Sequence, residues 1–234
     1  MNYQWNKSSK RTMIKAGFFL FLIILAGLAN AQPSKRGRNK PNIIIINMDD
    51  MGYGDTEPYG ATGYTTPNFN RLAREGMRFT HFYAAQAVCS PSRAALLTGC
   101  YPNRIGMSGG ALMPWSTKAI NTAEETIATL LKKEGYATAM LGKWHLGSKP
   151  PFLPLHFGFD SFYGIPYSHD MWPVDYEGKP ITDTANWRMR FLPLPVLEGN
   201  KQVSVITMLA EQSMLTTALT EKAEQFIAKN KNHP

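Results

Sequence analysis

Two kinds of hydrophobic pattern alternate along the chain. Short apolar runs at residues 42–47 and 137–141 predict buried strands, because such runs suit a sheet that is covered on both faces. Residues 67–76 and 122–134 predict helices, since each carries a helical start signal and ends at or just before a glycine. Strands that alternate with helices indicate an α/β fold with a largely parallel or mixed sheet flanked by helices.

Weaker patterns cover the remaining segments. Residues 77–83 alternate as a strand does, and residues 90–97 suit a helix. The stretch 204–229 is helix-like, at least from Leu215 onward. Residues 150–195 are rich in proline, glycine and aromatic residues, which predicts a long ordered loop region.

The N-terminus has the form of an export signal. An apolar run at residues 16–28 follows a basic start and precedes Ala29-Asn30-Ala31, a small-x-small cleavage pattern. A membrane anchor is the alternative, but the run is short for a spanning helix. We therefore expect a signal peptide over residues 1–31 and a bacterial protein, periplasmic or secreted, with no stable membrane association after cleavage.

All of the formal net charge of +8 lies before Pro41. The first 40 residues contain no acid and eight cations: Lys7, Lys10, Arg11, Lys15, Lys35, Arg36, Arg38 and Lys40. Residues 32–40 then form a basic flexible lead-in, and residues 41–234 form the domain with no excess charge. This distribution gives no sign of nucleic-acid binding.

Two cysteines, Cys89 and Cys100, leave two possibilities open. In an exported protein a disulfide between them is a reasonable expectation. A disulfide would consume Cys89, so it excludes any chemical role for that side chain.

Three groups of polar residues lie at the ends of expected elements: two follow strands and one begins a helix. Asp49 and Asp50 follow the first strand, where paired carboxylates repel each other unless a cation such as Ca²⁺ or Mg²⁺ lies between them. The alternative is a solvated turn. Sites in α/β sheets gather at such strand ends.

The other two groups contain cations and a nucleophile. Arg93 lies one helical turn after Cys89, and a guanidinium there can hold an anion. Lys143 and His145 follow the second strand and would point to the same side if that strand continued. Each group alone could be structural. Together with the carboxylates they suit hydrolysis of an ester of a small oxyanion.

The motifs resemble those of the type I sulfatases, in the arylsulfatase A and N-acetylgalactosamine-6-sulfatase branch. The resemblance covers residues 41–234 and is carried by Cys89-Ser90-Pro91-Ser92-Arg93 with Leu97-Thr98-Gly99, by residues 49–55, by residues 142–147 and by residues 163–170. It implies an alkaline-phosphatase-like α/β fold and hydrolysis of sulfate esters, either of small aryl sulfates or of sulfated glycans.

The resemblance also implies a role for each matched residue. A maturation enzyme would oxidise Cys89 to Cα-formylglycine, whose hydrate supplies the nucleophile, and Arg93 would steady that hydrate. Lys143 and Ser168 would bind the sulfate group. His145 would assist the chemistry of the diol.

The implied metal is calcium, with magnesium less suited. Its ligands would be Asp49, Asp50 and the oxidised Cys89. The family pattern continues with an Asp-Asn pair that completes the calcium site and with a second sulfate-binding lysine, and neither follows Ser168 in this sequence. We therefore expect an N-terminal part of the catalytic domain that is weakly active or inactive alone.

Two other functions remain open. One is a phosphonate or phosphodiester hydrolase of the same superfamily, which uses the same nucleophile. The other is an exported binding domain in which Cys89 is never matured.

Overall fold

The computed structural model describes residues 40–175 and 177–234. The expected signal peptide, and the lead-in apart from Lys40, lie outside these described residues. The part from Asn42 to Pro234 forms one compact unit. None of the helices in the described ranges has the length and apolar character to cross a membrane.

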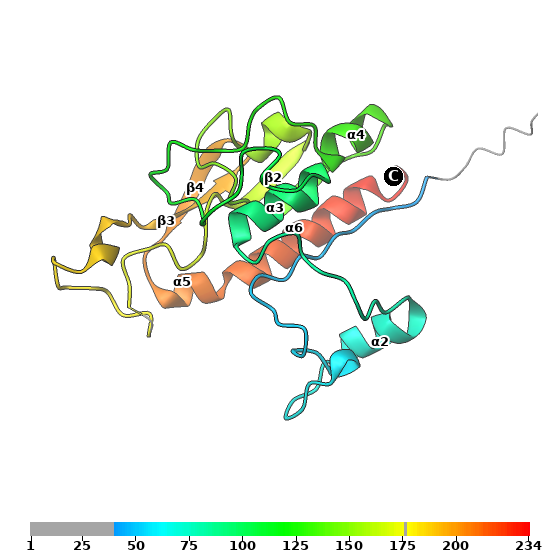
Figure 1. Ribbon diagram of the computed structural model, residues 1–234, viewed down its shortest axis with the longest axis horizontal. Coiled ribbons are helices and arrows are strands. Elements are labelled where there is room, and N and C mark those ends of the chain that lie inside the picture. Colours follow the sequence, from blue (N-terminus) through cyan, green and yellow to red (C-terminus); the bar gives the residue numbers. More distant parts are fainter. Residues whose placement is uncertain (1–39, 176) are drawn as a thin grey trace, which may run out of the picture. The chain divides into compact units, whose positions relative to one another are not determined.

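A four-stranded mixed sheet forms the centre of this unit (Figure 1). The strands β1 and β2 are parallel, and β3 and β4 add to β2 in antiparallel order. Their bounds are β1 (Ala139–Lys143), β2 (Ser161–Ile165), β3 (Leu194–Glu198) and β4 (Lys201–Ile206). The expected α/β fold with a largely parallel or mixed sheet is confirmed in its mixed form.

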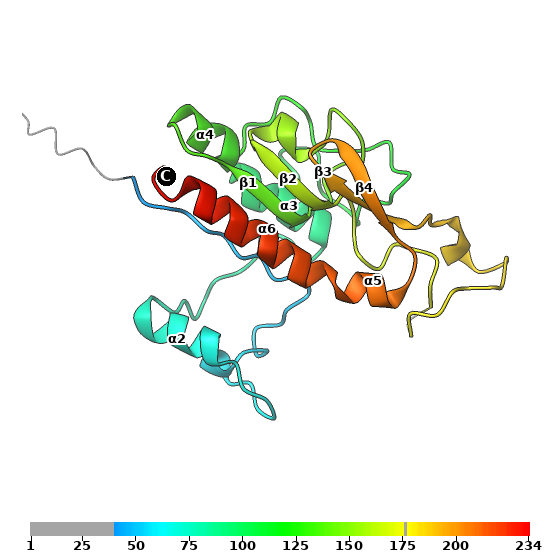
Figure 2. The same cartoon turned by 180° about the vertical axis from the view of Figure 1, so that it is seen from behind.

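Helices cover both faces of the sheet. The helix α6 (Leu215–Asn230) runs along β1 and β2 on one face, and α3 (Cys89–Thr98) lies on the other (Figures 1 and 2). The other helices are η1 (Glu57–Tyr59), α2 (Pro67–Glu75), α4 (Ile127–Lys133), η2 (Pro154–Phe157), η3 (Trp187–Arg190) and α5 (Leu209–Ser213).

The expected helices form, but one of them is shorter than predicted. Thr66 precedes α2 and Gly76 follows it, as the sequence signals indicate. The helix expected from residue 122 begins only at Ile127, because Thr126 is its N-cap and accepts a hydrogen bond from the amide of Thr129. The hydroxyl of Thr126 also donates to the carbonyl of Phe157, which fixes this start.

Two expected strands are wrong. Residues 42–47 form no strand, and Ile44 and Ile46 are 68% and 71% exposed. Residues 77–83 are likewise irregular and exposed. The physical reason is the same for both: within the described residues the sheet order β1-β2-β3-β4 gives neither segment a strand to pair with.

The expected long loop at residues 150–195 is also corrected, since β2 and the start of β3 lie within it. The helix expected from residue 204 begins later, because residues up to Ile206 belong to β4. Prolines around β3 argue against a strand in the sequence, yet Pro195 pairs in register with Val205. This pairing depends on contacts that the local sequence pattern does not reveal.

Two hydrophobic clusters pack in this unit. The first lies around Trp144 and Phe162 and includes Ala94 of α3. The second gathers side chains from the ends of β2, β3 and β4 with the segment after β2: Ile165, Tyr167, Met171, Trp172, Val174, Phe191, Leu194, Val196 and Ile206. Both clusters lie next to the expected site residues and hold their backbone in place.

Candidate active site

The helix α3 positions the expected nucleophile. Cys89 is its first residue, and Arg93 follows one turn later, so the predicted helical spacing is confirmed. Ser90, Pro91 and Ala94 are buried, which fixes the first turn against the core. Both cysteines are free, so the disulfide alternative is not realised in this structure.

The parallel strands β1 and β2 bring two further residues together. Lys143 is the last residue of β1, and Ser168 follows the end of β2. Because parallel strands end at the same edge of a sheet, their C-terminal side chains can meet. The Lys143 Nζ donates to the Ser168 Oγ over 2.9 Å.

Asp49 is the residue on which the cations converge. Its Oδ2 lies 2.6 Å from the Lys143 Nζ, and its Oδ1 lies 3.1 Å from an Arg93 Nη. A second Arg93 Nη donates to the carbonyl of Lys143 over 2.5 Å. Four of the expected residues, including Ser168, therefore form one hydrogen-bonded cluster.

The two cations lower the pKa of the Asp49 carboxyl. Burial alone would raise this pKa, but the hydrogen bonds and charges of Lys143 and Arg93 outweigh that effect. The carboxylate is therefore ionised at neutral pH. It neutralises two cationic side chains that are only 8% and 11% exposed.

We expect Asp49→Asn to destabilise the protein by about 2–3 kcal/mol, because Lys143 and Arg93 would then lie side by side without a carboxylate. Urea denaturation at neutral pH measures this change. Asp50→Asn is the matched control, because Asp50 is exposed and has no polar partner within the described ranges. This substitution should change the free energy of unfolding by no more than about 0.5 kcal/mol. Equal stability of the two variants would contradict the prediction.

His145 is buried, with 1% of its surface exposed. Its Nε2 donates to the carbonyl of Leu112 over 2.8 Å, because a carbonyl can only accept. The amide of Leu112 in turn donates to the Ser90 Oγ over 3.0 Å. Leu112 therefore connects His145 to the first turn of α3.

The neighbours of His145 keep its ring neutral. Burial is the main cause, and the charges of Lys143 and Arg93 add to it, so the pKa falls to about 4. The Nδ1 of this neutral tautomer carries a lone pair, and this buried atom has no hydrogen-bond partner in the described part of the chain. It can accept a hydrogen bond.

The strand does not continue to His145 as expected. Lys143 ends β1, and His145 adopts a left-handed backbone with φ 63°. Backbone hydrogen bonds from Trp144 and His145 to Ile165 and Pro166 hold this turn. Lys143 and His145 consequently contact different partners, Asp49 and Leu112.

The metal ligands are brought together only in part. Asp50 follows Asp49 in a left-handed turn with φ 55° and is exposed. Across residues 40–175 and 177–234, no three histidine, cysteine or acidic residues are grouped so as to hold a metal ion. The described residues alone thus do not make a complete calcium site.

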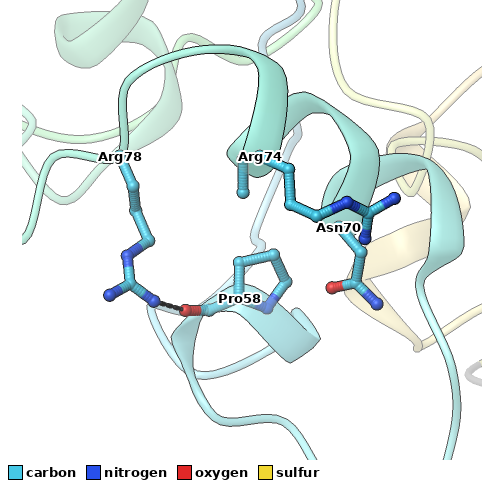
Figure 3. Close-up of a pocket in the computed structure, with 5 residues that line it drawn as sticks. Pro58, Asn70, Arg74 and Arg78 are labelled. Atoms are coloured by element: carbon cyan, nitrogen blue, oxygen red, sulfur yellow. Dashed lines mark hydrogen bonds between the residues drawn. The ribbon is translucent and has the colours of Figure 1, made fainter.

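Sequence reasoning missed the part played by Leu112. It acts through its backbone, so its side chain carries no signal that could reveal it. The buried Arg93 Nε is a second feature visible only in the structure, since it has no hydrogen-bond partner among the described residues. A pocket of about 360 Å³ beside α2, which Arg74 and Arg78 help to line, contains none of the expected site residues (Figure 3).

Comparison with known proteins points to one family. The family model described as "Sulfatase" matches residues 41–234. Arylsulfatase A of Homo sapiens is 51% identical over 156 residues, which cover 66% of this chain and 29% of that protein. N-acetylgalactosamine-6-sulfatase of Rattus norvegicus is 41% identical over 198 residues, covering 79% and 37%.

A solved structure shares the fold. The structure of Ps i-CgsB in complex with k-i-k-neocarrahexaose matches with a TM-score of 0.62 and 33% identity, covering 80% of this chain and 41% of that one. This likeness agrees with the expected alkaline-phosphatase-like α/β fold. The chain spans well under half the length of each of these relatives.

Proposed function

Because the chain belongs to the sulfatase family, we propose that it hydrolyses sulfate esters, of aryl alcohols or of carbohydrates, to an alcohol and inorganic sulfate. The observation that carries this proposal is the cluster in which Lys143, Arg93 and Ser168 meet around Asp49. It combines buried cations with a hydroxyl group, which suits a small oxyanion. The family relationship favours sulfate over phosphate.

We propose that a separate maturation enzyme oxidises Cys89 to Cα-formylglycine: that enzyme supplies the oxidant, and the sulfur leaves as the side-chain carbon becomes an aldehyde. The hydrate of this aldehyde supplies a geminal diol as the nucleophile for sulfur. Arg93, one turn along α3, has an unpartnered Nε with which to hold that group in place. Lys143 and Ser168 bind the sulfate oxygens, and the Nδ1 of the neutral His145 accepts a hydrogen bond from a hydroxyl of the diol.

Asp49, Asp50 and the matured Cys89 are the proposed ligands of Ca²⁺, for which carboxylate oxygens are suited. Calcium takes about 6–8 oxygen ligands, so these residues satisfy only part of its needs. No catalytic step is therefore assigned to the ion. Export remains part of the proposal, in agreement with the leader pattern of residues 1–31.

The test is turnover after maturation. The chain is co-expressed with a formylglycine-generating enzyme, and mass spectrometry of the Cys89 peptide shows whether the thiol has become an aldehyde. We expect the matured chain to release sulfate from 4-nitrophenyl sulfate, slowly for a chain of this length, and Cys89→Ala to release none. A peptide that stays a thiol, equal release by both proteins, or a preference for 4-nitrophenyl phosphate would refute the proposal.

A further inference from the structure

We infer that Trp115, Trp187 and Arg190 form a platform that binds the sugar units of a sulfated oligosaccharide beside the sulfate-ester site. The inference rests on the proposed function for the reaction performed there. It adds a site for the carbohydrate part of the substrate. The platform residues lie in the segment after α3 and in η3, the short helical turn just before β3 (Figure 1).

Phe191 holds the two tryptophans of the platform. Its ring is stacked with that of Trp115 at a centroid distance of 5.3 Å and an angle of 29°. The ring of Trp187 meets Phe191 edge-on, at 5.3 Å and 69°. Because Phe191 itself is buried, it fixes both indole rings to the core.

Much of both indole rings nevertheless remains in solvent. Trp187 is 52% exposed and Trp115 is 42% exposed. A rigid exposed aromatic surface of this kind marks a binding site more often than a single exposed side chain does. A pyranose ring has one face lined by C–H groups, and that face can pack on an indole while its hydroxyls stay in water.

Arg190 supplies the charge that a sulfated sugar requires. Its guanidinium lies 4.8 Å from the centre of the Trp115 ring. The side chain is exposed, and no carboxylate pairs with it in the part of the chain that the structure describes. A planar guanidinium in this position can bind two oxygens of one oxyanion.

Its neighbour Arg188 has a different task. Arg188 is buried, its Nε donates to the carbonyl of Val174 over 2.7 Å, and one Nη donates to the carbonyl of Asp170 over 2.5 Å. These bonds tie η3 to the segment that follows Ser168. Arg190 is thus the exposed arginine of this turn, available to a ligand, while the buried Arg188 anchors the turn.

Short stretches of chain connect both halves of the platform to the candidate active site. Trp115 follows Leu112 by three residues, which span at most about 11 Å, and Leu112 bonds both His145 and Ser90. Asp170, which Arg188 holds, follows Ser168 by two residues. A saccharide with one sulfate at Lys143 and Ser168 could therefore extend toward the two tryptophans.

The experiment measures binding rather than turnover. Isothermal titration calorimetry measures the affinity of the whole chain for a chondroitin 6-sulfate hexasaccharide. The same hexasaccharide after desulfation is measured in parallel. We expect the sulfated form to bind more tightly, with an affinity that falls as salt rises. We expect Trp187→Ala and Arg190→Gln each to weaken binding about five- to tenfold.

Matched controls separate the platform from general effects. Tyr101→Ala removes another exposed aromatic ring and Arg104→Gln another exposed arginine, and neither should change affinity. Trp187→Tyr keeps a stacking ring and should restore most of the binding. Circular dichroism verifies that every variant is folded.

The outcomes also separate the platform from the proposed reaction. Unchanged affinity in folded Trp187→Ala and Arg190→Gln, or equal binding of the desulfated sugar, would overturn the platform even if the matured chain releases sulfate. Loss of affinity in both variants would support the platform even in a chain that releases none.

Discussion

Gly164→Ala is expected to abolish the stable fold. Gly164 lies in β2 with φ 155°, directly opposite Gly142 of β1. A Cβ at this position would lie 2.0 Å from the carbonyl oxygen of Gly142, and backbone cannot rotate away as a flexible side chain can. The parallel pairing of β1 and β2 would have to open, at a cost of about 4 kcal/mol or more.

Thermal and urea denaturation measure this effect, and two other glycines provide controls. Gly109 has φ 112° but open space around it, so Gly109→Ala should cost only backbone strain of about 1–3 kcal/mol. Gly54 has open space and no such φ, so Gly54→Ala should be nearly neutral. If Gly164→Ala had the same melting temperature as Gly54→Ala, β1 and β2 would not pair as described.

The second large effect is a loss of stability between about pH 6.5 and pH 4 that depends on His145. The ordinary histidine pKa of 6.5 falls to about 4 in the folded protein, chiefly through burial. Between about pH 6.5 and pH 4 this histidine is protonated in the unfolded chain but neutral in the folded chain. Acid therefore favours unfolding. This difference between the unfolded and folded pKa values corresponds to a loss of about 3 kcal/mol in the free energy of unfolding.

Urea denaturation at a series of pH values tests this prediction. In His145→Gln the part of the pH dependence between about 6.5 and 4 should disappear, whatever the variant's stability at neutral pH. The unsubstituted chain, measured over the same series of pH values, is the control. The Asp49 carboxyl acts in a separate range: its pKa lies below 3.8, so its stabilising effect is lost only as the pH falls further. An unaltered slope in His145→Gln would show that the histidine titrates normally.

Elements with strong local signals could be predicted from the sequence. Proline at the start and glycine after the end placed α2, and the motif spacing placed Cys89 and Arg93 on one helix. The contact between Lys143 and Asp49 was not predicted: Lys143 does lie at the end of a strand, but the strand expected before Asp49 does not form. The roles of Lys143 and Asp49 in binding and catalysis remain predictions.

Elements that depend on distant partners could not be predicted. The apolar run at residues 42–47 has the composition of a strand, but strand formation requires a neighbour that pairs with it. Conversely, β3 contains Pro195 and forms because β2 and β4 lie on either side of it. The left-handed turn at His145 is likewise imposed by its hydrogen bonds to the segment after β2 and to Leu112.

The exposed isoleucines of residues 43–46 affect how the protein will behave in concentrated solution. Four consecutive β-branched side chains without charge or proline, in an unpaired segment, are the kind of sequence that pairs with a second copy of itself. Asp49 lies only three residues beyond them, so self-association through this segment would crowd the carboxylate that holds Lys143 and Arg93. We therefore expect self-association in concentrated solution to disturb the ion pairs of Asp49 with Lys143 and Arg93.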